Sequence, residues 1–553
     1  MCGIFLYYNK DKKTLEDNKD YIKKQFQLGS KRGPENSKVL LLDNYFFGFH
    51  RLAINGLDEI SNQPFDQDNV ILICNGEIYN HKELFHKLNI KPTTNSDCEI
   101  IIHLYKKYGI KYAVQQLDGV FAFILYDKSN GSIFVGRDPY GVRPLYFYRD
   151  YDKFIVASEL KQIVNIPNIF RSMVHQFLPG SYVSITSSKI LYQEKYIEFP
   201  SLKFIDSSFP VTIDYYQNQI NTYLRKAVKK RVENCERPVA CLLSGGLDSS
   251  LITALVAQYV PDVSKLETYS IGLEGSEDLK YAKIVADFLG TKHTQITLTE
   301  DEFFGSIPTV IHDISSFDTT TVRASVGNYL IGKYISENSD AKVIFNGDGS
   351  DELAGGYLYF HNCKTDFDFD YECKHLLKNI HYFDVLRSDR SISSHGLEAR
   401  TPFLDKSFVD FYLNIPIEIR NHNNTKNCEK YLIRSSFADV LPKEILWDMW
   451  FNANGISKTI KWGGSGGDYQ FTRPGYLKSS SGSWTSQWAG GDLSITITGP
   501  PQGDFLSEGS TSQWVDDTTG TPFYFNLTPN STIDYFNIDV DLDSVDDISE
   551  VTL

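Results

Sequence analysis

Between residues 239 and 346 the sequence alternates short apolar runs with helical patterns. The apolar runs are Val239–Leu243, Leu266–Ile271, His293–Leu298 and Lys342–Asn346. Apolar residues at helical spacing cover Ser249–Tyr259 and Asp278–Leu289 between them, and Tyr216–Val232 before them. Because parallel neighbouring strands need a crossover, usually a helix, this alternation predicts an α/β domain with a parallel sheet covered by helices.

The first 200 residues have a different pattern, with many short strands and few helices. Predicted strands are Val39–Leu42, Phe46–Phe49, Val70–Cys74, Val120–Tyr126 and Ile133–Gly136, and a predicted helix is Asp97–Tyr108. This pattern is typical of an α+β domain. A polar stretch around Ser201–Phe209 separates it from the α/β part. We therefore expect one domain at residues 2–200 and a second at residues 215–450.

Residues 451–553 form an atypical acidic tail. From Gly463 onward the tail is rich in Ser, Thr, Gly and Asp, and Thr-Ser-Gln-Trp occurs at both 485–488 and 511–514. Leu493–Thr498 and Pro522–Leu527 alternate in the manner of strands. A small β module or a partly disordered segment is expected, with the acidic stretch Asp534–Glu550 as a solvated surface.

Charge and composition exclude several classes of partner. The formal net charge of -15 argues against a nucleic-acid partner, because phosphate backbones need a basic surface. No apolar run is long enough to span a bilayer, and Asn9, Lys10 and Asp11 interrupt the apolar start that a signal peptide would continue. The 8 cysteines are scattered without metal-ligand spacing, as in a reduced cytoplasmic protein.

The chain begins Met1-Cys2-Gly3, which is a candidate nucleophile motif. If Met1 is removed, Cys2 carries a thiol and a free α-amine, whose pKa of roughly 8 lets it act as a base for the thiol. Asn75-Gly76 after an apolar strand offers an amide and a backbone N–H for an oxyanion. Arg51 offers a fork for a carboxylate, and Asp97 an acceptor for an ammonium group. Each of these motifs also has a purely structural interpretation. Arg51 could form a surface ion pair, Asp97 could cap a helix, and Asn75-Gly76 could form a hairpin turn.

Taken together, these motifs resemble the class II, N-terminal-nucleophile glutamine amidotransferases. Arg32-Gly33-Pro34, Gly136-Arg137-Asp138-Pro139 and Ala157-Ser158-Glu159-Leu160 extend the resemblance over about the first 190 residues. It implies an α/β/β/α sandwich and a glutaminase with Cys2 as nucleophile and Asn75 and Gly76 as the oxyanion hole. The implied glutamine-binding residues are Arg51, Leu52, Ala53, Ile54, Asn55, Asn75, Gly76, Glu77 and Asp97. Lys31 stands where asparagine synthetases usually carry His, a change that we expect to be tolerated.

The segment Ser244-Gly245-Gly246-Leu247-Asp248-Ser249-Ser250 lies between a predicted buried strand and a helix. Glycines, serine hydroxyls and a helix N-terminus are what a phosphate group needs, and Asp248 is a candidate Mg²⁺ ligand. Because the lysine of the Walker A motif is missing, this is not that loop. The segment resembles the loop of ATP pyrophosphatases, which adenylate a substrate and release pyrophosphate.

Three further segments resemble the asparagine synthetases: residues 317–325, 347–357 and 396–405. With them, the resemblance covers roughly residues 2–446. It implies an ATP-binding set of Leu243, Ser244, Gly245, Gly246, Asp248, Ser249, Ile271, Asn346 and Gly347. It further implies an acceptor site of Thr320, Thr321, Arg323, Glu398 and Arg400, a catalytic Asp348, and Mg²⁺ at Asp248 and Asp351.

The family reaction implied is the ATP-dependent amidation of aspartate through β-aspartyl-AMP, with ammonia from glutamine travelling inside the protein. The expected partners are glutamine, aspartate, ATP and Mg²⁺, and family analogy adds a homodimer. Two departures bear on the second half-reaction. Asp348 stands where the family usually has Glu, and the family's Arg-x-Lys is absent from Trp447–Gly455, with no lysine until Lys458.

These departures leave alternatives open. One is a glutaminase whose ligase half is impaired. Another is a pseudoenzyme that uses its tail for interaction, although the intact set of Cys2, Arg51, Asn75, Asp97 and Ser244–Ser249 argues against it. A third is a ligase for another carboxylate acceptor, for which the Arg323 and Arg400 segments make aspartate the better choice.

Overall fold

A computed structural model of the chain describes residues 1–186, 189–205, 212–424 and 428–448. Beyond these it describes only the backbone of short strands between residues 458 and 537. The chain divides into a compact unit of residues 1–357 and 364–441 and a second unit of residues 358–363 and 442–553. No helix of the described residues is both long and apolar enough to cross a bilayer.

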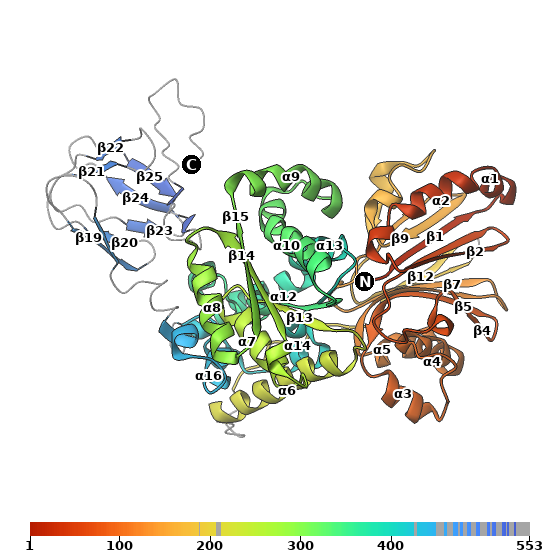
Figure 1. Ribbon diagram of the computed structural model, residues 1–553, viewed down its shortest axis with the longest axis horizontal. Coiled ribbons are helices and arrows are strands. Elements are labelled where there is room, and N and C mark those ends of the chain that lie inside the picture. Colours follow the sequence, from red (N-terminus) through yellow and green to blue (C-terminus); the bar gives the residue numbers. More distant parts are fainter. Residues whose placement is uncertain are drawn as a thin grey trace. The chain divides into compact units, whose positions relative to one another are not determined.

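The N-terminal domain contains two six-stranded antiparallel sheets (Figure 1). The first sheet has the order β10-β8-β9-β1-β3-β2 and the second the order β12-β11-β7-β6-β5-β4. The strands are β1 Gly3–Asn9, β2 Asn36–Leu42, β3 Tyr45–Arg51, β4 Phe65–Gln67, β5 Val70–Ile78, β6 Gly119–Asp127, β7 Ser132–Arg137, β8 Tyr146–Arg149, β9 Lys153–Ala157, β10 His175–Gln176, β11 Ser181–Thr186 and β12 Lys189–Lys195. The helices are α1 Lys12–Asp17, α2 Lys19–Gln27, α3 His81–Leu88, α4 Ile100–Tyr108 and α5 Ile110–Gln116.

Side chains alternate between the two faces of each strand, and their packing on both faces builds four layers. Ile4 and Leu6 of β1 pack with Ile71 and Ile73 of β5 in the core between the two sheets. Phe5, on the opposite face of β1, belongs to the cluster formed with α1 and α2, and the other faces of β5 and β6 pack on α3, α4 and α5. Successive side chains of a strand point to opposite faces, so each sheet buries both of its faces. The result is the expected α/β/β/α sandwich.

The second domain is built on a five-stranded parallel sheet with the order β15-β14-β13-β16-β17. Its strands are β13 Val239–Leu242, β14 Glu267–Leu273, β15 Lys292–Leu298, β16 Val343–Phe345 and β17 Glu398–Arg400. Its helices are α6 Ile213–Glu233, α7 Leu247–Ala257, α8 Glu277–Leu289, α9 Glu300–Ile314, α10 Thr319–Asn338, α11 Ser350–Ala354, α12 Asp366–Asn379, α13 Asp384–Ser393, α14 Lys406–Leu413, α15 Ile417–Arg420 and α16 Tyr431–Ser436. The parallel sheet expected from the strand–helix alternation is confirmed.

Buried ion pairs join the two domains. Arg32 Nη1 lies 2.7 Å from Asp389 Oδ1 on α13 and donates to Ser393 Oγ at 2.9 Å. Both Arg32 and Asp389 are nearly inaccessible to solvent. Since buried charges are costly unless paired, this contact fixes the N-terminal domain against α13.

The second unit contains short antiparallel strands. They are β18 Lys458–Lys461, β19 Asp468–Arg473, β20 Tyr476–Lys478, β21 Trp484–Gln487, β22 Ser494–Ile497, β23 Leu506–Glu508, β24 Thr511–Val515, β25 Pro522–Asn526, β26 Thr528–Pro529 and β27 Phe536–Asn537. Apart from these strands, the predictions made for residues 451–553 fall outside the described residues.

Candidate functional sites

Cys2 immediately precedes β1, at the centre of the first sheet. Its thiol lies 3.5 Å from the carbonyl oxygen of Leu52, and burial raises the pKa of this thiol. In the unprocessed chain, the terminal amine belongs to Met1, which is itself buried and lies 3.4 Å from the carbonyl oxygen of Leu397. Burial lowers the pKa of that amine to about 6. Removal of Met1 would transfer the terminal amine to Cys2, next to the thiol.

Asn75 and Gly76 lie on β5, the strand whose register with β6 is unbroken from Val70 to Ile78. Neither side-chain atom of the Asn75 amide, which is fully buried, has a hydrogen-bond partner. A buried amide without partners costs roughly 1–3 kcal/mol, so the Asn75 amide is free to donate to a ligand. A Cβ at Gly76 would lie 2.6 Å from the Cα of Phe121, so only glycine fits there.

Glu77 and Asp97 form a pair of buried acids near these residues. Burial, followed by the charges of Asp97 and Glu398, raises the pKa of Glu77 well above its usual value. Burial also raises the pKa of Asp97, whose Oδ2 accepts from Ile78 N at 2.6 Å. Two desolvated carboxylates favour an added cation, which is the chemistry of an α-ammonium group.

The segment from Arg51 to Asn55 runs beside these acids. The Arg51 guanidinium donates to the Asp58 carbonyl at 2.9 Å and to Asn62 Oδ1 at 2.7 Å, so here it holds its own loop. The Asn55 amide donates to Glu77. Leu52, Ala53 and Ile54 are the buried residues between them. The structure therefore brings the predicted glutamine-binding residues into one neighbourhood, on β3, β5 and the segments that follow β3 and precede α4.

The predicted phosphate loop connects β13 to α7. Gly245 has a φ of +85°, which favours glycine, and Gly246 is the N-cap of α7. Ser249 Oγ lies 2.8 Å from Ser244 Oγ and accepts from Ser244 N at 3.2 Å. Backbone N–H groups and hydroxyls at a helix N-terminus suit a phosphate. Leu243 is buried at the base of this loop, where its N–H donates to the carbonyl of Tyr269, and Ile271 lies further along β14.

Lys430, which sequence reasoning did not select, lies between the two predicted metal ligands. Its ammonium is 2.5 Å from Asp248 Oδ2 and 2.6 Å from Asp351 Oδ1. Gly356 leaves space for it, because a Cβ there would collide with Lys430 Cε. Carboxylate oxygens are the hard donors that Mg²⁺ prefers, so Asp248 and Asp351 would fit a Mg²⁺ ion. No cluster of three or more metal-ligating side chains occurs among the described residues.

Asn346, Gly347 and Asp348 follow β16 and face the phosphate loop. A Cβ on Gly347 would lie 2.8 Å from the Cβ of Asp248, so the two loops pack closely. The Asn346 amide donates to Asp348 Oδ2 at 2.8 Å. Burial raises the pKa of Asp348 to about 6, against the opposing charge of Arg387, whose Nη2 is 3.5 Å from Oδ1.

The residues predicted for the acceptor site lie in two environments. Thr320, Thr321 and Arg323 belong to the first turns of α10, where Thr321 is buried and Arg323 is exposed. Glu398 and Arg400 are buried on β17, and Arg400 Nη2 lies 3.4 Å from Glu77 Oε2. The contacts of Arg400 therefore link it to the predicted glutamine site. Of the altered segment 447–455, only Trp447 and Asp448 fall within the described residues.

Comparisons with known proteins cover both domains. Residues 1–200 match the glutamine amidotransferase domain family, and residues 219–368 and 365–449 match the asparagine synthase family. The chain is 40% identical to the glutamine-hydrolysing asparagine synthetase of Rattus norvegicus over 81% of this chain and 83% of that protein. The identity to the corresponding protein of Homo sapiens is 39%, with the same coverage. The chain belongs to the glutamine-hydrolysing asparagine synthetases.

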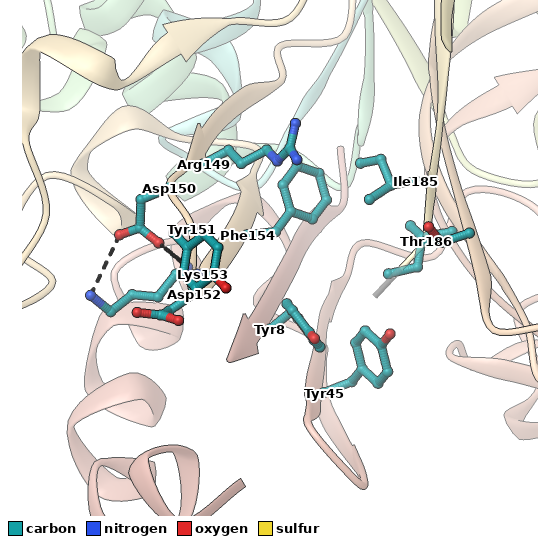
Figure 2. A pocket seen from close by; sticks show the side chains of 11 residues that line it. Tyr8, Tyr45, Arg149, Asp150, Tyr151, Asp152, Lys153, Phe154, Ile185 and Thr186 are labelled. Carbon is teal, nitrogen blue, oxygen red and sulfur yellow. Dashed lines mark hydrogen bonds and ion pairs between the residues drawn. The ribbon is translucent and has the colours of Figure 1, made fainter. Parts of the chain in front are cut away.

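This family assignment explains why two sets of polar residues occur in one chain. The glutamine amidotransferase domain carries Cys2, Asn75, Glu77 and Asp97, and the asparagine synthase domain carries the phosphate loop. A separate pocket of the first domain, shown in Figure 2, holds no predicted site residue. It is lined by Tyr8, Tyr45, Ile133, residues 149–154, Ile185 and Thr186. Among its lining residues, Lys153 Nζ lies 3.6 Å from Asp150 Oδ2.

Proposed function

We propose that this chain synthesises asparagine from aspartate and ATP, using ammonia released from glutamine. The observation that carries the proposal is that one domain holds Cys2 and the buried, unpartnered Asn75 amide, and a second domain holds the predicted phosphate loop with two acids that share Lys430. The relatives match across both domains, which supports coupling of the two reactions. The proposed domain limits are 2–200 for the glutaminase and 215–450 for the synthetase.

In the glutaminase reaction, Cys2 attacks the side-chain amide of glutamine after removal of Met1. The new α-amine takes the thiol proton, and the Asn75 amide with the Gly76 N–H stabilises the oxyanion. As the intermediate collapses, the C–N bond breaks, the amine returns the proton to the leaving ammonia, and a thioester to Cys2 remains. Water then cleaves this thioester to release glutamate and the free thiol. Glu77 and Asp97 hold the α-ammonium group. Arg51 would leave its present loop contacts to bind the α-carboxylate, with Leu52, Ala53, Ile54 and Asn55 shaping the site.

In the synthetase reaction, the loop Ser244–Ser249 holds the β- and γ-phosphates of ATP, and Leu243, Ile271, Asn346 and Gly347 line the nucleotide. Asp248 and Asp351 would hold Mg²⁺, which neutralises charge on the phosphate oxygens. Thr320, Thr321 and Arg323 are proposed to bind aspartate, and Asp348 to act near the acyl-adenylate. Lys430 adds a positive charge where pyrophosphate departs.

A second candidate function is glutamine hydrolysis with an impaired ligase half. It is favoured by one observation: the shorter Asp348 is held by the Asn346 amide and Arg387. We further propose a cytoplasmic location, a homodimer, and no nucleic-acid or membrane partner.

The test is the variant Cys2→Ala, with and without glutamine. We expect it to release no glutamate from glutamine but to make asparagine from ammonium, aspartate and ATP at a rate within about threefold of the unaltered enzyme. Cys235→Ala, a thiol outside the proposed nucleophile position, is the matched control. Glutamate release by Cys2→Ala would contradict the assignment of the nucleophile.

A further inference from the structure

Two residues of the synthetase domain reach the acids of the proposed glutamine site. Asn234, the C-cap of α6, donates through Nδ2 to Glu77 Oε2 at 3.2 Å and to Asp97 Oδ2 at 3.5 Å. Arg400 Nη2 is 3.4 Å from the same Glu77 oxygen. Asn234 is 6% exposed and Arg400 is 1% exposed. The second domain therefore supplies polar partners that water cannot supply at these acids.

The Arg400 guanidinium is held rigidly. Its Nη1 donates to the Asn234 carbonyl at 2.9 Å, and its Nε donates to Glu398 Oε1 at 2.9 Å. The β17 backbone is fixed as well, because Asn346 N donates to the Arg400 carbonyl at 3.1 Å. Nη2 is buried and makes no hydrogen bond, although it carries two N–H donors. A buried guanidinium nitrogen left without hydrogen bonds is costly, so it favours an ionised Glu77 beside it.

The charges around Glu77 show what Arg400 contributes. Asp97 and Glu398 face Glu77 with negative charge, and Arg400 and Arg143 oppose them. Beyond these, His81 faces Asp97, and the N-terminal amine faces Glu398. Arg400 lowers the pKa of Glu77 more than Arg143 does, so its removal would raise that pKa further and favour the protonated acid. A neutral carboxyl binds an ammonium group more weakly than a carboxylate does.

We propose that Arg400, held by Asn234 and Glu398, is a positioning residue for glutamine, which places a positive charge beside Glu77 and aims this acid at the α-ammonium group. The synthetase domain thereby completes the glutamine site of the other domain. This proposal rests on the proposed glutamine hydrolysis at Cys2. It gives Arg400 a different role from the aspartate-binding one that the family resemblance implies.

The test compares Arg400→Met and Arg400→Lys with the unaltered enzyme. Glutamate release from glutamine is measured across pH 6.5 to 9, about the range in which a raised carboxyl pKa is detected. For Arg400→Met we expect KM for glutamine to rise at least about tenfold at pH 7, with kcat changed less than about threefold. KM should fall again as the pH rises, because Glu77 then loses its proton. Arg400→Lys should restore most of the affinity, and Arg171→Met, an exposed arginine of the same domain as Cys2, is the matched control.

A second variant tests the same role if Arg400→Met fails to fold. Asn234→Ala keeps the guanidinium but removes the amide that donates to Glu77 and Asp97, and we expect a rise of about three- to tenfold in KM for glutamine. An unchanged KM for glutamine in folded Arg400→Met would overturn the proposal. So would a rise only in KM for aspartate, measured with ammonium, which would place Arg400 at the acceptor site. If the unaltered enzyme releases no glutamate, the proposed function itself fails, and this role of Arg400 fails with it.

Discussion

The ammonium group of Lys430 lies 2.5 Å from a carboxylate oxygen of Asp248, 182 residues earlier in the chain. Lys430 has a φ of 55°, a conformation that non-glycine residues rarely adopt. It is the N-cap residue of α16, and 6% of its side chain is exposed. Because this lysine is strained and buried beside the predicted phosphate loop, we propose that its charge acts there.

Lys430→Met should therefore impair the synthetase reaction and spare the glutaminase. We expect asparagine synthesis from ammonium to fall at least about 100-fold, since a charge aimed at departing pyrophosphate is worth roughly 3 kcal/mol. Glutamate release from glutamine should change less than about threefold. Lys229→Met, on the exposed face of α6, is the control. Synthesis at the unaltered rate would show that Lys430 serves only the fold.

Gly356→Ala tests the same lysine without removing its charge. A Cβ at this position would collide with Lys430 Cε and with Asp351 Oδ1. We expect the lysine to be displaced and the synthetase rate to fall about 10- to 100-fold, with the glutaminase rate retained. Gly305→Ala on α9 is the matched control, because its Cβ would meet no atom within 4 Å. Equal synthetase rates in Gly356→Ala and Gly305→Ala would show that the synthetase reaction does not depend on the position of Lys430.

The pKa of Asp348, raised by burial to about 6, predicts a pH-dependent stability. In the folded protein, Asp348 stays protonated at pH values above the ordinary carboxyl pKa. The free energy of unfolding therefore falls as the pH rises from about 4 to 6. Above pH 6, Asp348→Asn should be more stable than the unaltered protein by about 1–3 kcal/mol, and near pH 4 the difference should vanish. Thermal unfolding at both pH values measures this, with exposed Asp340→Asn as control. A stability difference between Asp348→Asn and the unaltered protein that does not change with pH would contradict a raised pKa of Asp348.

The Arg32–Asp389 pair should hold the two domains together. Arg32→Met leaves Asp389 buried without its closest cation, which costs roughly 3–5 kcal/mol. The double variant Arg32→Met/Asp389→Leu should lose less stability than the sum of the two single variants. Denaturant unfolding of the four proteins gives this comparison. Strictly additive losses would mean that the pair is not coupled.

Much of the fold was predictable because burial sets the sequence pattern. The strands at Val70–Ile78 and Gly119–Asp127 and the helix Glu277–Leu289 lie where period-2 and helical patterns place them. β17 was missed as a strand because its three residues include two charged ones, Glu398 and Arg400, which are buried by ion pairs rather than by apolar contacts.

The site residues that the sequence did not reveal act across long separations. The motif around Asp248 predicts a phosphate loop, but no local pattern connects it with Lys430. In the same way, nothing near Glu77 in the sequence indicates Asn234 or Arg400 as its partners. The left-handed backbone of Lys430 could not be foreseen either, because lysine rarely adopts it.

We propose that this single chain couples glutamine hydrolysis to asparagine synthesis. The most direct test supplies the purified protein, with Cys2 shown by mass to be N-terminal, with aspartate, ATP and Mg²⁺. One sample receives glutamine and another ammonium, and asparagine, glutamate and pyrophosphate are quantified. We predict asparagine with an equal amount of pyrophosphate from both nitrogen sources. Glutamate without asparagine from glutamine, together with no asparagine from ammonium, would contradict the account and leave a glutaminase alone.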